Sequence, residues 1–205
     1  MAVAGSTVGL SMQIKEFMTT SIKLTPIGRY TTGSFDKGAA EIPAYDPISQ
    51  RLFVVNAEDV TVDVLDLSDP GNPTKIFAIN ASTFGGSANS VAINNGIVAI
   101  AIENKNTQEP GRVVFTDTDG NFLNAVPVGA LPDMLTFTPD GKKVLVANEG
   151  EPNDDYTIDP EGSISIIDIS SGVENICKEN ITTVDFQAFN NQLEELKIAG
   201  VRIFG

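Results

Sequence analysis

Short apolar runs recur along most of the chain, and turn-forming residues separate them. Some runs alternate apolar with polar residues, which predicts half-buried strands, while others are continuously apolar and rich in β-branched side chains, which predicts strands buried on both faces. Turn signals of the Asn-Gly or Asp-Gly type stand between runs at Asn95-Gly96, Asp119-Gly120 and Asp140-Gly141. Such dipeptides favour tight hairpins. The pattern therefore predicts an all-β fold of antiparallel strands.

The strand pattern is repeated within the chain. The segment 44–58 aligns with the segment 136–150 at a constant offset of 92 residues, and a shorter middle copy occupies 89–105. Each copy continues into a third strand that ends in aspartate, and these aspartates are spaced 51 residues apart: Asp66, Asp117 and Asp168. Units of about 45 residues with four antiparallel strands are typical of β-propeller blades.

We therefore predict an incomplete β-propeller over residues 22–205, with residues 1–21 as a leader or linker. About three four-stranded blades are expected, at residues 38–84, 85–129 and 130–183. Closed propellers have about four to eight blades. We expect the chain to be a fragment of a longer protein, and the alternative is that several chains assemble.

One segment near the C-terminus has helical rather than strand spacing. Phe189, Leu193 and Leu196 lie on one face of a helix, which predicts a short inserted helix at about residues 191–199. Asn191, followed three residues later by a glutamate, is the expected start. Gly200 is the expected C-terminal stop.

Composition limits the chemistry of the chain. The net charge is −14, so nucleic acid is not expected as a partner, because binding it requires a basic surface. The chain has no His and one Cys, Cys177, which excludes a Ser-His-Asp triad and a multi-Cys metal site within it. A metal held by this chain alone needs oxygen ligands, which favours Ca²⁺ or Mg²⁺. No run reaches the length of a membrane-spanning helix.

Acidic and amide residues at equivalent blade positions form the first candidate cation site. The innermost strand of each copy begins beside a polar residue: Glu41, Asn89 and Asp133. Such residues should point to one end of the propeller axis, near Asn148 and Glu149 at the end of a second strand. A ring of oxygen ligands there could hold Ca²⁺. The alternative is that these side chains bind loop amides and cap strand ends.

The acidic stretch between two strands, 149–162, forms the second candidate. Asn153, Asp155, Thr157, Asp159 and Glu161 alternate along it, and in an extended segment alternate side chains share one face. That face could also bind Ca²⁺, although the spacing is not that of an EF-hand. The alternative is a solvated hairpin. Across both candidates the predicted metal ligands are Glu41, Asp133, Asn148, Glu149, Asp155 and Asp159.

The aspartates that end the third strands receive a structural interpretation. Asp66, Asp117 and Asp168 stand at one position of the repeat. Aspartate at a turn accepts hydrogen bonds from nearby backbone N–H groups. We therefore expect these three residues to fix turns rather than to bind ligands.

Two long stretches strongly resemble the bacterial choice-of-anchor I domain. They are "GRYTTGSFDKGAAEIPAYDPISQRLFVVNAEDVTVDVLDLSDPGNPTKI" and "VGALPDMLTFTPDGKKVLVANEGEPNDDYTIDPEGSISIIDIS". The "TPDGKKVLVAN" motif alone looks like the widespread YVTN-type blade, whereas "NEGEPNDDYTIDPEGS" is more specific. The resemblance covers about residues 22–205, and it implies a β-propeller that continues beyond this chain.

The resemblance implies a location, and the residues and the resemblance together leave two competing functions. Family members are long secreted or surface proteins that carry varied C-terminal anchors, so we expect an extracellular or cell-surface protein. The first function is a binding scaffold for an unknown protein or surface ligand, stabilised by Ca²⁺. The alternative is part of a Ca²⁺-dependent phosphomonoesterase, because some members are labelled alkaline phosphatase or look similar to phytase-like propellers. We expect this chain alone to be inactive in that reaction, and the resemblance assigns no catalytic residue.

Overall fold

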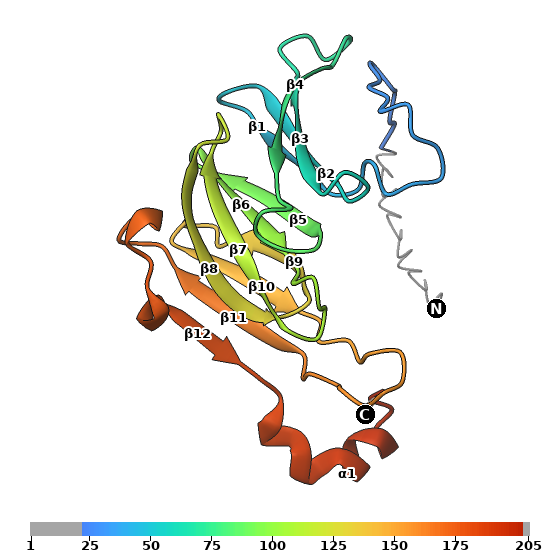
Figure 1. The fold of residues 1–205 in the computed structure, drawn as a ribbon, viewed down its shortest axis with the longest axis vertical. Coiled ribbons are helices and arrows are strands. Elements are labelled where there is room, and N and C mark those ends of the chain that lie inside the picture. Colours follow the sequence, from blue (N-terminus) through green and yellow to red (C-terminus); the bar gives the residue numbers. More distant parts are fainter. Residues whose placement is uncertain (1–21, 203–205) are drawn as a thin grey trace, which may run out of the picture.

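The computed structural model of the chain describes residues 22–202, so the predicted leader or linker at residues 1–21 lies outside the described part. The described residues form three antiparallel four-stranded sheets, in which sequential strands are neighbours. The prediction of an all-β chain with three four-stranded units and one short helix is confirmed at this level. The described residues do not close into a ring (Figure 1).

Each sheet comes from one copy of the sequence repeat. Sheet 1 consists of β1 (Pro43–Asp46), β2 (Arg51–Asn56), β3 (Thr61–Asp66) and β4 (Thr74–Asn80). Sheet 2 consists of β5 (Ala88–Asn94), β6 (Ile97–Ile102), β7 (Pro110–Asp117) and β8 (Phe122–Ala130). Sheet 3 consists of β9 (Pro132–Phe137), β10 (Lys143–Asn148), β11 (Ser163–Asp168) and β12 (Ile181–Val184).

The sheets pack in chain order, with sheet 2 between the other two (Figure 1). The sequence of β6 explains how sheet 2 serves both neighbours. Val98, Ile100 and Ile102 face the core shared with sheet 1, whereas Ala99 and Ala101 face the core shared with sheet 3. Because successive strand side chains point to opposite faces, a continuously apolar strand must be buried on both sides, as the sequence predicts for this run.

Large side chains fill both cores. Phe53 lies between sheets 1 and 2. Phe115 lies between sheets 2 and 3, on the face of sheet 2 to which β6 contributes only small alanines. Both rings are 0% exposed. Burial of β-branched and aromatic side chains between sheets supplies the main stabilisation of this kind of fold.

The turn between β5 and β6 forms as predicted. Asn95 and Gly96 both have positive φ, 49° and 80°, which is the conformation of a type I′ hairpin turn. Asn and Gly are the residues that adopt it at least cost.

The three repeated aspartates are turn residues, as predicted. In each case one carboxylate oxygen accepts a hydrogen bond from the backbone N–H two residues later: Ser68 to Asp66, Asp119 to Asp117 and Ser170 to Asp168. The pKa of each carboxyl is lowered. At Asp66 the main cause is a hydrogen bond from the Ser68 backbone, and at Asp168 it is a hydrogen bond from the Ser170 side chain. At Asp117 burial alone would raise the pKa, but hydrogen bonds from Asn121 outweigh this effect.

These shifts predict a loss of stability in acid. A carboxyl whose folded-state pKa is depressed stabilises the fold above its unfolded pKa, near 3.8 here, and this contribution is lost as the pH falls through the folded pKa. We expect the urea midpoint to fall as the pH is lowered below about 4. The triple variant Asp66→Asn, Asp117→Asn, Asp168→Asn keeps an acceptor at each turn but does not titrate. It should therefore show a shallower pH dependence, and an unchanged slope would contradict the assignment.

The predicted helix forms, with a different start. The helix α1 spans Leu193–Ile198 and follows a 3₁₀ segment, Gln187–Gln192. The prediction that Asn191 caps it is wrong: Gln192 occupies the N-cap and no side chain makes a capping hydrogen bond. The C-terminal prediction is confirmed, because Gly200 has a φ of 89° and donates its N–H to the Lys197 carbonyl, as expected of a residue just past a helix end.

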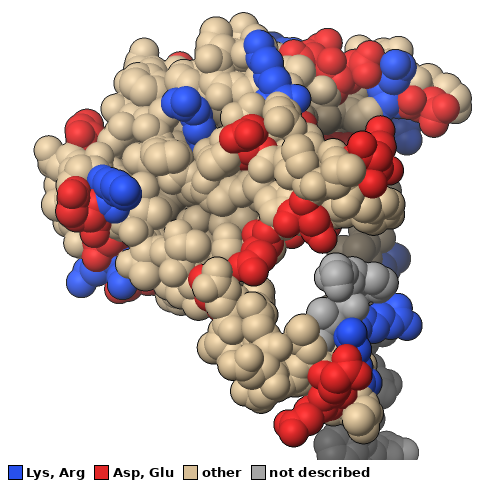
Figure 2. All heavy atoms as spheres, turned by 60° about the horizontal axis from the view of Figure 1, so that its bottom comes forward, with Lys and Arg blue, Asp and Glu red and all other residues tan. Residues whose placement is uncertain are grey.

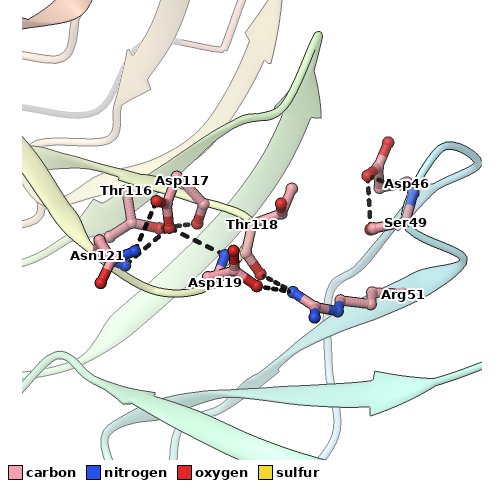
Figure 3. A network of polar contacts seen from close by, with 8 residues as sticks. All are labelled: Asp46, Ser49, Arg51, Thr116, Asp117, Thr118, Asp119 and Asn121. Carbon is pink, nitrogen blue, oxygen red and sulfur yellow. Dashed lines mark hydrogen bonds and ion pairs between the residues drawn. The ribbon is translucent and has the colours of Figure 1, made fainter.

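Hydrogen bonds of one arginine side chain connect the outer turns of sheets 1 and 2 (Figure 3). Arg51 of β2 donates from Nη1 to the Thr118 carbonyl and to the Asp119 carboxylate, each at 2.6 Å. Its guanidinium also lies 5.8 Å from the centre of the Phe77 ring, within cation–π range. The hairpin turn of β7 and β8 is thereby held against the neighbouring sheet.

Sheet 1 also contains a buried carboxylate. Asp63 is 2% exposed, and Lys75 of the adjacent strand β4 reaches it at 2.8 Å. Asn56 and Thr61 donate further hydrogen bonds to the same carboxylate. The charge is therefore buried with a cation and hydrogen-bond donors, as buried charges require.

Candidate functional site

The first strands of the three sheets line one open groove. β5 lies next to both β1 and β9, and residues of these strands and of the segments just before them surround a cavity of about 810 Å³. Its volume falls within the range of pockets that bind small molecules.

Glu41, Asn89 and Asp133 all line this groove, so the structure places the three equivalent residues together as predicted. Glu41 and Asp133 are exposed. Asn89 donates through Nδ2 to the Glu103 carboxylate at 3.1 Å and to the Pro132 carbonyl at 3.2 Å. Asn89 therefore bridges sheets 2 and 3, which is the structural role considered as its alternative.

Glu149 lies close enough to Asp133 for their charges to interact. Its pKa is raised, mainly because it is partly removed from water and also because the carboxylates of Glu151 and Asp133 lie near it. Among the described residues, no Lys or Arg contributes to this pKa shift. The repulsion from Glu151 and Asp133 is therefore not offset by a side-chain cation. Burial is the larger cause, and the like charges of Glu151 and Asp133 act in the same direction, so the position favours protonation or a bound cation.

Asn148, which directly precedes Glu149, is buried, at 3% exposed. Its Nδ2 donates to the hydroxyls of Ser163 and Ser165 at 3.1 and 2.9 Å. Its Oδ1 has no hydrogen-bond partner. In sheet 1 the equivalent residue, Asn56, accepts from the Asp59 backbone N–H; in sheet 3 the acidic stretch replaces that short turn. An unsatisfied buried carbonyl oxygen is uncommon.

The acidic stretch is not extended, so the premise that its alternate side chains share one face is wrong. Asn153 Oδ1 accepts from the backbone N–H groups of Thr157 and Ile158, and the chain turns through Tyr156 at a φ of 56°. Asp155 accepts from the backbone and hydroxyl of Thr157. Asn and Asp side chains compete in this way with extended backbone. Asp155 therefore serves the turn, and the alternative of a solvated hairpin describes it better.

Asp159 lies in a different hollow from Glu41 and Asp133. It shares a cavity of about 540 Å³ with Glu149 and Glu161 on one side and Phe186 and Leu193 on the other. In Figure 2, Asp and Glu side chains gather beside the opening between the sheets and the C-terminal segment. Glu161 also accepts a hydrogen bond from Gln187. The six predicted ligands therefore divide among a groove, a buried site, a turn and this hollow.

Within residues 22–202, no group of three or more Asp, Glu, Cys or His side chains is arranged to hold a metal ion. Ca²⁺ binding by the predicted ligands therefore stays a prediction.

Sequence reasoning missed the apolar members of the groove. Ile42, Tyr45 and Met134 line it and are 44%, 49% and 51% exposed. The signal was present in the repeat, because Ile42 and Met134 are 92 positions apart and each follows an acidic residue. An exposed apolar residue next to a carboxylate at two equivalent positions indicates a shared surface rather than a core.

Comparison with known families gives a direct assignment. The model of the choice-of-anchor I domain matches residues 41–205. The chain belongs to the choice-of-anchor I domain family. Membership of this family suggests a surface-associated protein. No helix within residues 22–202 has the length and apolarity needed to cross a membrane. No curated protein matches the chain significantly.

Solved structures share the fold of this choice-of-anchor I chain at low sequence identity. A putative 6-phosphogluconolactonase from Bacteroides fragilis is 17% identical with a TM-score of 0.54, covering 72% of this chain and 40% of that one. Hydrazine synthase from Kuenenia stuttgartiensis is 20% identical with a TM-score of 0.52, covering 71% and 37%. A luciferin-regenerating enzyme is 14% identical with a TM-score of 0.51, covering 68% and 47%. The chain spans less than half of each, and the likeness concerns fold alone.

Proposed function

We propose that this choice-of-anchor I chain is part of a larger β-propeller displayed outside the cell, and that it acts as a binding module through the groove lined by β1, β5 and β9. The observation that carries the proposal is the convergence of the first strands of all three sheets on one groove that Glu41 and Asp133 line. Family membership supports the surface location. Propellers commonly present ligand sites where their inner strands converge.

The face of sheet 3 that points away from sheet 2, here called its open face, supports the presence of further blades. Four residues of sheet 1 that face sheet 2 are 0% exposed: Phe53, Val55, Val62 and Val64. The repeat places Leu145, Ala147, Ile164 and Ile166 at the equivalent positions of sheet 3, and these are only half-buried. Lys143 stands where Arg51 stands and is exposed. This face of sheet 3 therefore has the same apolar pattern as the face of sheet 1 that sheet 2 covers, which indicates that another sheet packs on it.

The gene itself tests this part of the proposal. We expect the reading frame downstream of codon 205 to encode more copies of the four-stranded unit. A stop codon directly after Gly205 would contradict a larger single-chain propeller and would require several chains to cover the open faces.

Calcium is the cation proposed between Asp133, which lines the groove, and Glu149, which lines the neighbouring hollow. Asp133 and Glu149 would supply carboxylates, and Asn148 Oδ1 is a carbonyl oxygen without a partner. Hard oxygen ligands of this kind suit Ca²⁺. An ion there would also offset the repulsion from Glu151 and Asp133, which adds to the effect of burial in raising the pKa of Glu149.

A calcium titration tests this site. Binding to the folded state alone raises its stability by about 2.7 kcal/mol at a hundredfold excess over Kd, which for a chain of this size shifts Tm by roughly 2–4 °C per kcal/mol. The shift should grow as the pH rises through the raised pKa of Glu149, above its usual 4.5, because the ligand must be deprotonated.

A matched pair of variants separates the site from net charge. Asp133→Asn with Glu149→Gln should abolish the Ca²⁺-dependent shift. Glu194→Gln with Glu195→Gln on α1 changes the net charge equally and should keep it. Equal behaviour of the two variants, or no shift in the unmodified chain, would remove Ca²⁺ from the proposal.

An activity assay separates binding from the phosphomonoesterase alternative. We expect no hydrolysis of a chromogenic phosphomonoester by this chain, with or without added Ca²⁺. Hydrolysis that EDTA abolishes would instead favour the enzymatic function.

A further inference from the structure

The groove lined by β1, β5 and β9 combines two chemical features along its length. Glu41 and Asp133 both line it, Glu41 two residues before β1 and Asp133 at the start of β9. Ile42, Tyr45 and Met134 expose between 44% and 51% of their surface in the same cavity. A concave surface that mixes exposed apolar groups with a few charges is typical of a small-molecule site.

The charges in this groove have one sign. The described residues that line it include Glu41 and Asp133 but no Lys or Arg. Coulomb attraction therefore favours a cation and disfavours an anion, and low-dielectric walls strengthen this preference. The chain as a whole, with its net charge of −14, adds to the same field.

The same pair of residue types recurs in or just before the two strands that flank β5. The acidic–apolar pair Glu41–Ile42 on one side repeats as Asp133–Met134 on the other, while Asn89 and Ser90 lie between them. Ser90 Oγ accepts the Leu135 backbone N–H at 3.3 Å, and Asn89 bonds to the Pro132 carbonyl. These bonds fix β5 against β9, so the centre of the groove is held in place without a ligand.

We propose that this groove binds a small organic cation, with an ammonium or guanidinium group at the carboxylates of Glu41 and Asp133 and an apolar body against Tyr45, Ile42 and Met134. This inference rests on the proposed binding function and names the class of ligand. The carboxylates supply charge-assisted hydrogen bonds. The face of the Tyr45 ring and the thioether of Met134 supply contacts that suit an apolar or aromatic body next to a cation.

Three probes of similar shape test the charge requirement directly. They are 2-phenylethylammonium, 2-phenylethanol and phenylacetate, which carry a positive, neutral and negative head on the same aromatic body. Binding is followed by chemical-shift changes in ¹H–¹⁵N and methyl spectra of the full chain. We expect the cation to bind about tenfold more tightly than the alcohol, a difference of about 1.4 kcal/mol, and the anion not to bind. The cation should weaken as ionic strength increases.

The footprint and a matched variant pair locate the site. Shift changes should concentrate on Ile42, Tyr45, Asn89 and Met134. Glu41→Gln with Asp133→Asn should reduce binding of the cation to the level of the alcohol, and Tyr45→Leu should weaken the cation and the alcohol together. Glu194→Gln with Glu195→Gln, of equal net charge, should bind the cation normally.

The outcomes distinguish this inference from the binding function on which it rests. If the alcohol binds as tightly as the cation, or if the footprint lies outside the groove, the organic-cation inference is wrong. If Ca²⁺ moves the groove signals while 2-phenylethylammonium does not, the inference fails and the proposed binding function stands. If neither probe perturbs the groove, both fail.

Discussion

Replacing Phe53 with alanine is expected to lower the free energy of unfolding by about 3–5 kcal/mol, the usual cost of removing a large ring from a closed core. The ring is 0% exposed between sheets 1 and 2. Its counterpart in the repeat, Leu145, is only half-buried because no sheet among the described residues covers it. The change Leu145→Ala should cost about 1–2 kcal/mol, since part of that side chain already contacts water. Urea unfolding of the two variants measures the difference.

A second pair controls for the difference between phenylalanine and leucine. Ile100 is 0% exposed, whereas Ile166 on the open face is half-buried. Changing each to alanine removes the same atoms, and the first change should cost clearly more. If Leu145→Ala and Ile166→Ala were as costly as their buried partners, something would be covering the open face in solution. Sedimentation at the same protein concentration would show whether that cover is a second copy.

The strands and turns could be predicted because their causes are local. Alternation sets which face a side chain occupies, so β6 could be recognised as buried on both sides from Ile97–Ile102 alone. The Asn95-Gly96 turn and the repeated aspartates depend on contacts within a few residues. Gly200 ends its helix for the same reason.

The acidic stretch could not be predicted because two local arrangements compete there. Alternation alone suggests an extended chain, but Asn153 closes a turn by accepting two backbone hydrogen bonds. Asp155 is used in the same turn. The sequence contains these residues but not the energy difference between the two arrangements.

The site was predicted in part. The shared groove of Glu41, Asn89 and Asp133 follows from equivalent positions in a repeat, and the structure places all three there. The raised pKa of Glu149 and the unpaired Oδ1 of Asn148 depend on contacts between strands and loops that no local pattern encodes. The exposed Tyr45 was also missed, since an aromatic residue in a strand more often indicates a core.

Replacing Asp63 with alanine should be the other strongly destabilising change. It would leave Lys75, Asn56 and Thr61 without their shared acceptor. Breaking a buried ion pair costs about 3–5 kcal/mol; because the Lys75 side chain is 35% exposed and can regain water, we expect roughly 2–4 kcal/mol. In sheet 3 the equivalent residue is Ser165, whose partner Asn148 keeps Ser163. Ser165→Ala should therefore cost only about 1 kcal/mol.

The pH dependence of stability distinguishes the ion pair from simple packing at Asp63. The pKa of Lys75 is raised, first by its hydrogen bond to Asp63. A raised folded-state pKa gives stability that is complete below the unfolded value, near 10.5, and that is lost as the pH rises through the folded pKa. The unmodified chain should therefore weaken above about pH 10.5, and Asp63→Asn, which preserves shape, should weaken less steeply there. If both proteins respond alike to alkali, Asp63 stabilises sheet 1 through its shape and hydrogen bonds, and its charge contributes nothing measurable.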